Sequence, residues 1–455
     1  MSKKLQGALF LLLFLSFANF SCQKEVSEDL AQEKNVSPSN KTGVNGHLQQ
    51  AKTFSSDVII RWLNMQMEML RLPLPAGTGA QSTDRSQAYC GIAAYEAVVN
   101  GMPAYQSLEH QLTDFPEMPK TEPGKAYHWA ASANAALAEM NRRLFPTTSA
   151  ANKTAMTNLE STLQTTYAAE VNDATLQRSI AFGKEVATRI FAWAASDGSA
   201  NVNPPYVPPV GMGLWVPTAA TPAINPYASQ RRLLAPASAN GTALAPLPAF
   251  STDPSSDYYA MVKEVYDASL TLTTEQKAMA DYFKDNPGYG AGGTYVAAFT
   301  QALNIAQFKL DMAALAYAKV GIAQHDATIV LFVNKYIFNV MRPITYIRLY
   351  INPAWNSYIP TPNHPEYPSG HATITGGALT MMSNVFGEKF PMTLHTYDYL
   401  NYPPRSYSTF TQMGLDIANS RIYGGLHYRL TCERSIAQGK KVAENIISTV
   451  KFLKE

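Results

Sequence analysis

Apolar side chains recur at helical spacing along most of the chain from Ser56 onward, and this periodicity restricts the fold most strongly. Val58, Trp62, Met65 and Met69 lie on one helical face. Similar patterns predict helices over 85–100, 126–143, 150–169, 174–196, 256–270, 273–285, 293–320, 324–341, 370–386, 408–420 and 433–453. Convincing strand alternation is absent, so the sequence predicts an all-α protein with two four-helix-bundle-like halves.

The segment 201–255 interrupts this helical pattern, because it is crowded with Pro, Gly, Ser, Thr and Asn. An irregular stretch of this length inside a compact chain is usually functional or a linker. It separates a predicted N-terminal helical bundle over 55–200 from a predicted C-terminal helical bundle over 256–455.

The N-terminus has the form of a targeting segment. Two lysines precede an apolar stretch at 8–18, which is too short for a confident membrane span and typical of a signal peptide over 1–22. Cys22 follows a small residue, as at a bacterial lipoprotein cleavage site, so we expect a lipid anchor at Cys22; simple secretion remains the alternative. The protein is therefore expected to be exported, as a periplasmic or cell-surface lipoprotein or in secreted form. The polar segment 23–54 is predicted to be a disordered tether.

Composition excludes several partners. The formal net charge of +2 gives no case for nucleic acid or an anionic membrane surface. The cysteines do not form a disulfide framework or a zinc motif. Once Cys22 carries lipid, Cys90 and Cys432 remain, either as a pair or as two buried thiols.

The first chemical cluster contains Lys335 and Arg342-Pro343. The two cations are seven residues apart, or two helical turns, so they are predicted to share one helical face. Pro343 is expected to disturb or end that helix. Taken alone, the cluster also fits a solvated basic surface.

The second cluster is Pro-Ser-Gly-His at 368–371, followed by a helical stretch. Ser369 and Gly370 offer a hydroxyl and free backbone N–H groups at a helix start, where the macrodipole favours an anion. His371, in the first turn, can exchange a proton near neutral pH. The plainer interpretation is that Ser369 is only an N-cap.

The third cluster runs from Ser420 to His427. Arg421 offers a planar fork of donors suited to oxyanions. Gly424 and Gly425 are expected to break the helix and to let the backbone approach a neighbour closely. Together the three clusters supply three cations, a hydroxyl, a helix N-terminus and two histidines, which suit a tetrahedral or trigonal-bipyramidal oxyanion.

These clusters resemble the motifs of the superfamily shared by type 2 phosphatidic acid phosphatases, bacterial acid phosphatases and vanadium haloperoxidases. The matching positions are Lys335, 342–343, 368–371, 420–421 and His427. The stretches that resemble the bacterial haloperoxidase branch are 213–218, 341–348, 364–372 and 420–429. The firm resemblance covers about 330–430, and a weaker one extends back to about 210.

The resemblance implies vanadate as cofactor. It further implies that His427 would bond to vanadium through a ring nitrogen and that His371 would be the acid–base residue that assists peroxide. The residues that would hold the oxygens of vanadate are Lys335, Arg342, Ser369, Gly370 and Arg421.

The sequence departs from the phosphatase-type pattern at one position. That pattern has an aspartate four residues after the last histidine, where this chain has Thr431. A carboxylate there would orient His427 and raise its basicity. Thr431, a backbone carbonyl or water must take over this task, and the change argues modestly against a phosphatase.

The residues beside the motifs suggest which halide is oxidised. His364 stands where algal bromoperoxidases have His and fungal chloroperoxidases have Phe, so the resemblance favours bromide or iodide over chloride. Phe332 is predicted to line the same pocket or to be core. Glu366 and Asp326 are candidate partners of the buried cations, with solvent exposure as the alternative.

The sequence therefore predicts a vanadium-dependent haloperoxidase that uses hydrogen peroxide to oxidise iodide or bromide. Two alternatives use the same pocket: a soluble acid phosphatase and a non-catalytic oxyanion-binding lipoprotein. Phosphate and vanadate require the same residues, so the pocket alone does not separate them.

Overall fold

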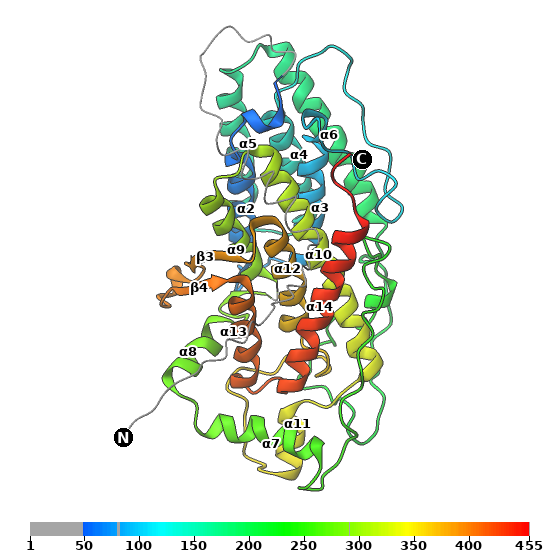
Figure 1. The fold of residues 1–455 in the computed structure, drawn as a ribbon, viewed down its shortest axis with the longest axis vertical. Helices are drawn as coiled ribbons and strands as arrows, with labels where there is room; N and C mark the ends of the chain where they lie inside the picture. Colours follow the sequence, from blue (N-terminus) through cyan, green and yellow to red (C-terminus); the bar gives the residue numbers. More distant parts are fainter. Residues whose placement is uncertain (1–48, 80–81, 291, 455) are drawn as a thin grey trace, which may run out of the picture. The chain divides into compact units, whose positions relative to one another are not determined.

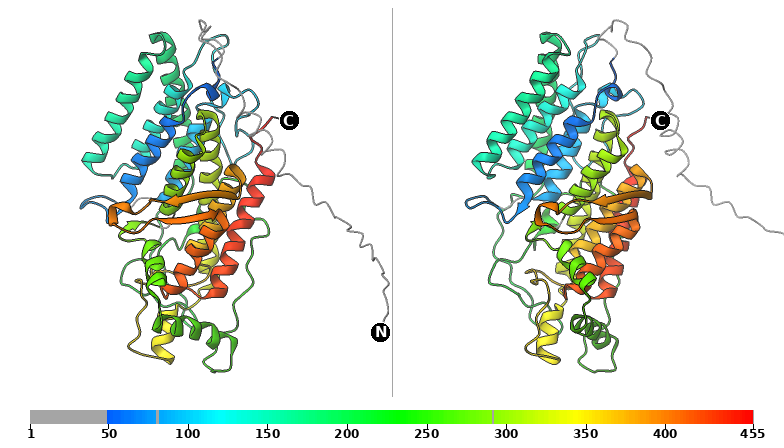
Figure 2. Two further views of the ribbon diagram at one scale, coloured as in Figure 1. Left: turned by 60° about the vertical axis from the view of Figure 1, so that its left-hand side comes forward. Right: turned by 90° about the vertical axis from the view of Figure 1, so that its left-hand side faces the viewer.

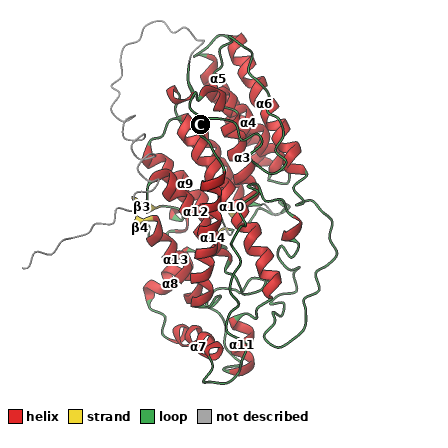
Figure 3. Ribbon diagram, turned by 45° about the vertical axis from the view of Figure 1, so that its right-hand side comes forward, coloured by secondary structure: helices red, strands yellow, loops and turns green. Residues whose placement is uncertain are grey.

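The computed structural model describes residues 49–79, 82–290 and 292–454. Residues Gly46–Glu455 form one compact unit. Helices dominate the described part (Figure 3), which confirms the predicted all-α class. The predicted signal peptide, Cys22 and most of the segment 23–54 lie outside the described residues, although the end of that segment forms a 3₁₀ turn, η1 (Ala51–Thr53), with Phe54 buried.

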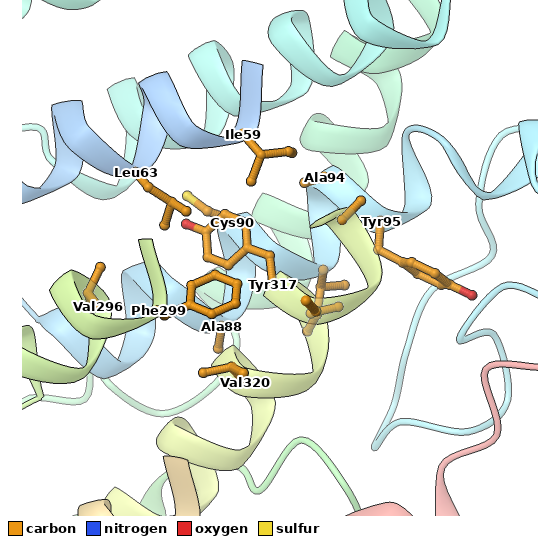
Figure 4. Packing of buried hydrophobic residues seen from close by; sticks show 14 of the residues in the cluster. Ile59, Leu63, Ala88, Cys90, Ala94, Tyr95, Val296, Phe299, Tyr317 and Val320 are labelled. Carbon is orange, nitrogen blue, oxygen red and sulfur yellow. The ribbon is translucent and has the colours of Figure 1, made fainter. Parts of the chain in front are cut away.

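The N-terminal helices pack around α4, and α3 lies against α10 of the C-terminal half (Figure 1). Figure 4 shows this junction, where Cys90 of α3 and Tyr317 of α10 lie in one buried cluster with Leu63 and Phe299. The helices here are α2 (Asp57–Leu70), α3 (Thr83–Glu96), α4 (Trp129–Leu144), α5 (Ala150–Ala168) and α6 (Asp173–Ala195). Cys90 and Cys432 are both buried and free.

The C-terminal helices pack around α12, which contacts α10, α13 and α14. None of the described helices has the length and apolarity needed to cross a membrane. The helices are α7 (Asp257–Leu270), α8 (Thr274–Tyr282), α9 (Gly293–Ala306), α10 (Leu310–Phe338), α11 (Pro343–Tyr350), α12 (Gly370–Phe386), α13 (Phe410–Tyr423) and α14 (Arg429–Thr449).

Side-chain caps fix where several of these helices begin. In each case a short polar side chain accepts a hydrogen bond from a backbone N–H of the first turn, which would otherwise have no partner. The capping residues are Ser149, Asn172, Ser256, Thr273, Ser369 and Thr409.

Two antiparallel strand pairs were not predicted. β1 (Arg71–Leu72) pairs with β2 (Gly288–Tyr289), and β3 (Lys389–Leu394) pairs with β4 (Arg405–Thr409) with Met392 opposite Tyr407. The β3–β4 hairpin, orange in Figure 2, packs against α9, α12 and α13. β1 and β2 have only two residues each, too few to show alternation, and the β3–β4 pair has a register shift between Lys389 and Met392.

The predicted division between two helices at 320–324 is wrong. The sequence suggested helices over 293–320 and 324–341, but α9 ends at Ala306 and α10 continues unbroken through 321–323. A Cβ added at Gly321 would lie 2.6 Å from the carbonyl oxygen of Gln87. This glycine therefore marks a close approach of α3, while the chain turns at Gln307, whose φ is 53°.

The α12–α14 contact is similarly close. A Cβ added at Gly439 of α14 would lie 1.8 Å from the carbonyl oxygen of Thr373, and one at Gly376 of α12 would lie 2.1 Å from that of Ile436. Glycine at these positions lets the two helices pack backbone against backbone. This contact sets the position of the α12 N-terminus relative to the start of α14.

The irregular segment is held along the C-terminal half by buried side chains. Asp326 of α10 accepts hydrogen bonds from the backbone N–H groups of Leu234 (2.8 Å) and Ala235 (2.9 Å). Asn445 of α14 donates to the carbonyls of Ser238 and Asn240. Apart from the 3₁₀ turn η3 (Ala228–Gln230), the segment has no described helix, as predicted.

Candidate active site

Lys335 and Arg342 come together, but not on one helical face as the sequence predicted. α10 ends at Phe338, Asn339 adopts a left-handed conformation, and Arg342 is the residue before α11. Pro343 therefore begins a helix, a position where its missing N–H costs nothing. The irregular segment pairs with this linker, because Met341 N–H donates to the Gly213 carbonyl and Trp215 N–H to the Asn339 carbonyl.

The Lys335 ammonium lies beneath the loop that leads to α12. It is fully buried and donates to the carbonyls of Pro365 (2.8 Å), Glu366 (3.2 Å) and Pro368. Burial lowers the pKa of Lys335 well below its usual value, and Arg342 lowers it further. A direct bond from Lys335 to an oxyanion therefore requires exchange of one of these carbonyl partners.

Arg342 joins the two pocket histidines. Its Nε donates to the His364 carbonyl (2.8 Å), its Nη2 lies 2.9 Å from His364 Nδ1, and its Nη1 lies 3.3 Å from His427 Nε2. Burial lowers the pKa of Arg342 to about 10, so the side chain is still charged at neutral pH.

The start of α12 has the predicted form. Ser369 is the N-cap and is fully buried, and His371 lies in the first turn with its Nε2 3.0 Å from Asp285 Oδ1. Burial lowers the pKa of His371, Arg421 lowers it further, and Asp285 opposes the shift. The hydroxyl of Tyr295 donates to the His371 carbonyl at 2.9 Å and thereby fixes the backbone of this turn.

Arg421 lies in the last turn of α13, and Gly424 follows at the end of the helix. Arg421 Nη1 donates to the Phe283 carbonyl at 2.6 Å, while Arg421 Nε is buried with no hydrogen-bond partner among the described residues. An unpaired buried donor on a cation is costly, and an anion in the pocket would relieve that cost.

His427 is held by Glu366. Its Nδ1 lies 2.9 Å from Glu366 Oε1, and Thr431 donates to Glu366 Oε2 at 2.9 Å. Glu366, from another part of the chain, thus supplies the carboxylate that the missing aspartate at position 431 would have provided. Burial raises the pKa of Glu366 to about 7, against the pull of Arg342 and Lys335.

The charges around the pocket favour an anion. Three buried or nearly buried cations, Lys335, Arg342 and Arg421, lie against two carboxylates, Glu366 and Asp285. The donors include a guanidinium nitrogen without a partner and the helix N-terminus at Ser369. These residues fit an oxyanion such as vanadate or phosphate.

The two candidate halide residues also meet. The rings of Phe332 and His364 are 5.6 Å apart in an edge-to-face arrangement, and both side chains are buried. Asp326, in contrast, makes its hydrogen bonds within the described residues to the irregular segment and to His325 and not to the pocket cations.

Sequence reasoning missed Asp285 and the bond between Glu366 and His427. Asp285 lies in the link between α8 and α9, outside every motif, and no local pattern marks it. Glu366 interacts with the cations as expected, since Arg342 and Lys335 oppose the rise of its pKa, but its side-chain hydrogen bonds go to His427, Tyr428 and Thr431. A carboxylate two residues after His364 in a motif stretch was the available signal.

Residues 315–455 match the family model of the VCPO second helical-bundle domain. The structure of the first bacterial vanadium-dependent iodoperoxidase matches with 26% identity over 91% of this chain and 99% of that chain, at a TM-score of 0.78. The chain has the vanadium haloperoxidase fold.

Two bacterial vanadium-dependent chloroperoxidase structures show the same haloperoxidase fold. The apo form matches with 18% identity over 87% of this chain and 98% of that chain, at a TM-score of 0.63. The holo form matches with 17% identity over 90% and 94%, at a TM-score of 0.61. No curated protein sequence matches.

Proposed function

We propose that the protein is a vanadium-dependent haloperoxidase, which oxidises iodide or bromide with hydrogen peroxide to hypohalous acid. In the balanced reaction the halide loses two electrons, the O–O bond breaks, and one proton is taken up as water leaves. The observation that carries the proposal is the pairing of a cation-rich buried pocket with His427, whose Nε2 presents a lone pair toward Arg342.

Bound vanadate would act there as a Lewis acid that activates peroxide toward halide. Arg342 and Arg421 would place positive charge against the oxyanion, and Lys335 would join them by exchanging a carbonyl partner. Ser369 and the Gly370 N–H, at the start of α12, would add donors. His427 would supply the ligand nitrogen.

His371 is the residue proposed to move protons. Asp285 holds its Nε2, which leaves Nδ1 available for proton exchange with peroxide or the departing water. The side chain of His371 retains 14% exposure, so it lies at the solvent side of the pocket, unlike His427 at 4%.

The choice of bromide or iodide rests on the buried pair of His364 and Phe332. His364 accepts a hydrogen bond from Arg342 and reduces the donors that this arginine can turn toward an oxyanion. A less strongly polarised peroxide suits halides that are easier to oxidise.

A phosphatase remains the second candidate, and one observation favours it. The sequence has threonine instead of aspartate at position 431, which argues against a nucleophilic histidine, but Glu366 supplies a carboxylate to His427. The carboxylate–histidine pair is therefore compatible with both reactions. Only an activity measurement distinguishes the two enzymes from a non-catalytic oxyanion-binding protein.

The deciding experiment assays protein loaded with vanadate for peroxide-dependent oxidation of iodide, bromide and chloride, beside hydrolysis of p-nitrophenyl phosphate by vanadate-free protein. We expect iodide and bromide oxidation that His427→Ala abolishes. Phosphate ester hydrolysis without halide oxidation would favour the phosphatase, and tight vanadate binding with neither activity would favour an oxyanion-binding protein.

We also propose that the protein is exported and anchored through lipid at Cys22. The support is the sequence of residues 1–22. Mass spectrometry of the N-terminal peptide from the native host should show a lipid-modified Cys22, and release of Cys22→Ser protein from the membrane fraction should follow. An unmodified, uncleaved N-terminus would contradict export by this route.

A further inference from the structure

Glu366 lies where three segments of the site converge. Its backbone N–H donates to the Val340 carbonyl at 2.9 Å, in the linker between Lys335 and Arg342. Its own carbonyl accepts from Lys335 Nζ at 3.2 Å. The backbone of Glu366 is therefore fixed by the cation side of the pocket, while its side chain extends toward α14.

The carboxylate of Glu366 accepts three hydrogen bonds from α14 and the residues before it. Oε1 accepts from His427 Nδ1 at 2.9 Å and from the Tyr428 backbone N–H at 3.1 Å, and Oε2 accepts from Thr431 Oγ1 at 2.9 Å. Glu366 and Thr431 are both fully buried. Neither oxygen is free to move toward a pocket cation.

The contacts of His427 on its other side fix the ring proton. Arg342 has only donors, so the Nε2 that lies 3.3 Å from its Nη1 must present a lone pair. The proton of the neutral ring is then on Nδ1, where Glu366 accepts it. Two independent neighbours thus select the same tautomer.

We propose that Glu366 is the positioning residue of His427, and that Thr431 holds Glu366 in place. The carboxylate fixes the tautomer and the ring direction so that Nε2 faces the oxyanion. Thr431, in the first turn of α14, acts on the carboxylate and not on the histidine. This inference depends on the proposed function only in taking His427 as the residue that binds the oxyanion.

The test uses Glu366→Gln and Thr431→Val in the full-length protein, with vanadate itself as the probe. Because partners that orient a metal-binding histidine are typically worth about 10–100-fold in affinity, Glu366→Gln should weaken vanadate binding by that order. Thr431→Val, which leaves Oε2 unpaired, should weaken it by less, and Thr431→Ser should restore it.

A second measurement reports the tautomer without any turnover. In protein labelled with ¹⁵N-histidine and free of vanadate, His427 should show a protonated Nδ1 and an unprotonated Nε2. Glu366→Gln should mix the two tautomers, since an amide can either donate or accept at Nδ1. Glu96→Gln is the matched control, because Glu96 is likewise buried and accepts from Leu108 N–H and Ser107 Oγ, outside the pocket.

A folded Glu366→Gln protein with unchanged vanadate affinity and an unchanged His427 tautomer would overturn the proposal. Equal weakening in Glu96→Gln would do the same, since it would reduce the effect to general destabilisation. Glu366-dependent vanadate binding without halide oxidation would instead reject the proposed function and leave this inference intact.

Discussion

The Nε2 atom of His371 lies 3.0 Å from Asp285 Oδ1, although the two residues belong to α12 and to the link before α9. Asp285 is 40% exposed and therefore lies toward the mouth of the pocket. His371, the proposed proton carrier, and the buried His427 thus each have a carboxylate partner, one near solvent and one in the interior.

Asp285→Asn should lower the rate of halide oxidation and displace its pH profile to lower pH. Asp285 raises the pKa of His371 against burial and Arg421, so loss of its charge lets that pKa fall further. A rate that needs protonated His371 then survives only at lower pH. The pH dependence of kcat measures this, and Asp281→Asn, at a carboxylate bonded to Lys284 and Tyr358, is the control. An undisplaced profile would contradict the assignment.

His364→Phe should raise the oxidation of bromide relative to iodide. The variant removes the ring nitrogen that accepts from Arg342 Nη2 and returns this donor to the oxyanion site. Stronger withdrawal of electron density from peroxide favours halides that are harder to oxidise. The ratio of kcat/KM for the two halides is the measurement, and Phe332→Leu tests whether loss of ring packing alone has the same effect. A ratio that does not move argues against His364 in halide choice.

The ionised carboxylate of Asp84 should stabilise the folded protein near neutral pH and lose this effect in acid. Burial opposes its charge, but Arg231, whose Nη2 lies 2.6 Å from Asp84 Oδ2, prevails and lowers the pKa of the carboxyl to about 2. Because the pKa is lowered in the folded state, the stabilisation is present above the unfolded value and is lost as pH falls toward about 2. Asp84→Asn should cost about 2 kcal/mol near neutral pH and progressively less in acid. Denaturant unfolding of both proteins at several pH values checks this; a difference that grows in acid would refute it.

Gly439→Ala should destabilise the protein strongly and weaken vanadate binding. The added Cβ meets the Thr373 carbonyl at 1.8 Å, so α12 and α14 must separate. Overpacking of this kind typically costs about 1–3 kcal/mol, and a backbone clash belongs at the upper end. Thermal unfolding and vanadate titration measure the two effects. Gly290→Ala, where the nearest atom is 3.9 Å away, should leave both unchanged.

The helical class and the pocket residues could be predicted because both are written in short-range patterns. Apolar spacing shows which face of a helix is buried, and Ser369 before His371 forms an N-cap from local backbone geometry. The boundary between α9 and α10 could not be read this way, since Gly321 serves packing against α3. The prediction that Lys335 and Arg342 share one helical face was wrong for a related reason. The backbone between them pairs with residues 213–215, and this pairing holds it extended.

The sequence by itself determined the helices and the set of side chains suited to an oxyanion. Only the tertiary structure decided which carboxylates form hydrogen bonds to the two histidines of this set. Glu366 reaches His427 across 61 positions of sequence, and Asp285 reaches His371 from another link between helices. A carboxylate needs only to lie within hydrogen-bond distance of its histidine, so any segment that packing brings there can supply it. Thr431 marks the place where the local pattern lacks a carboxylate, and the loop before α12 provides one by packing Glu366 against α14.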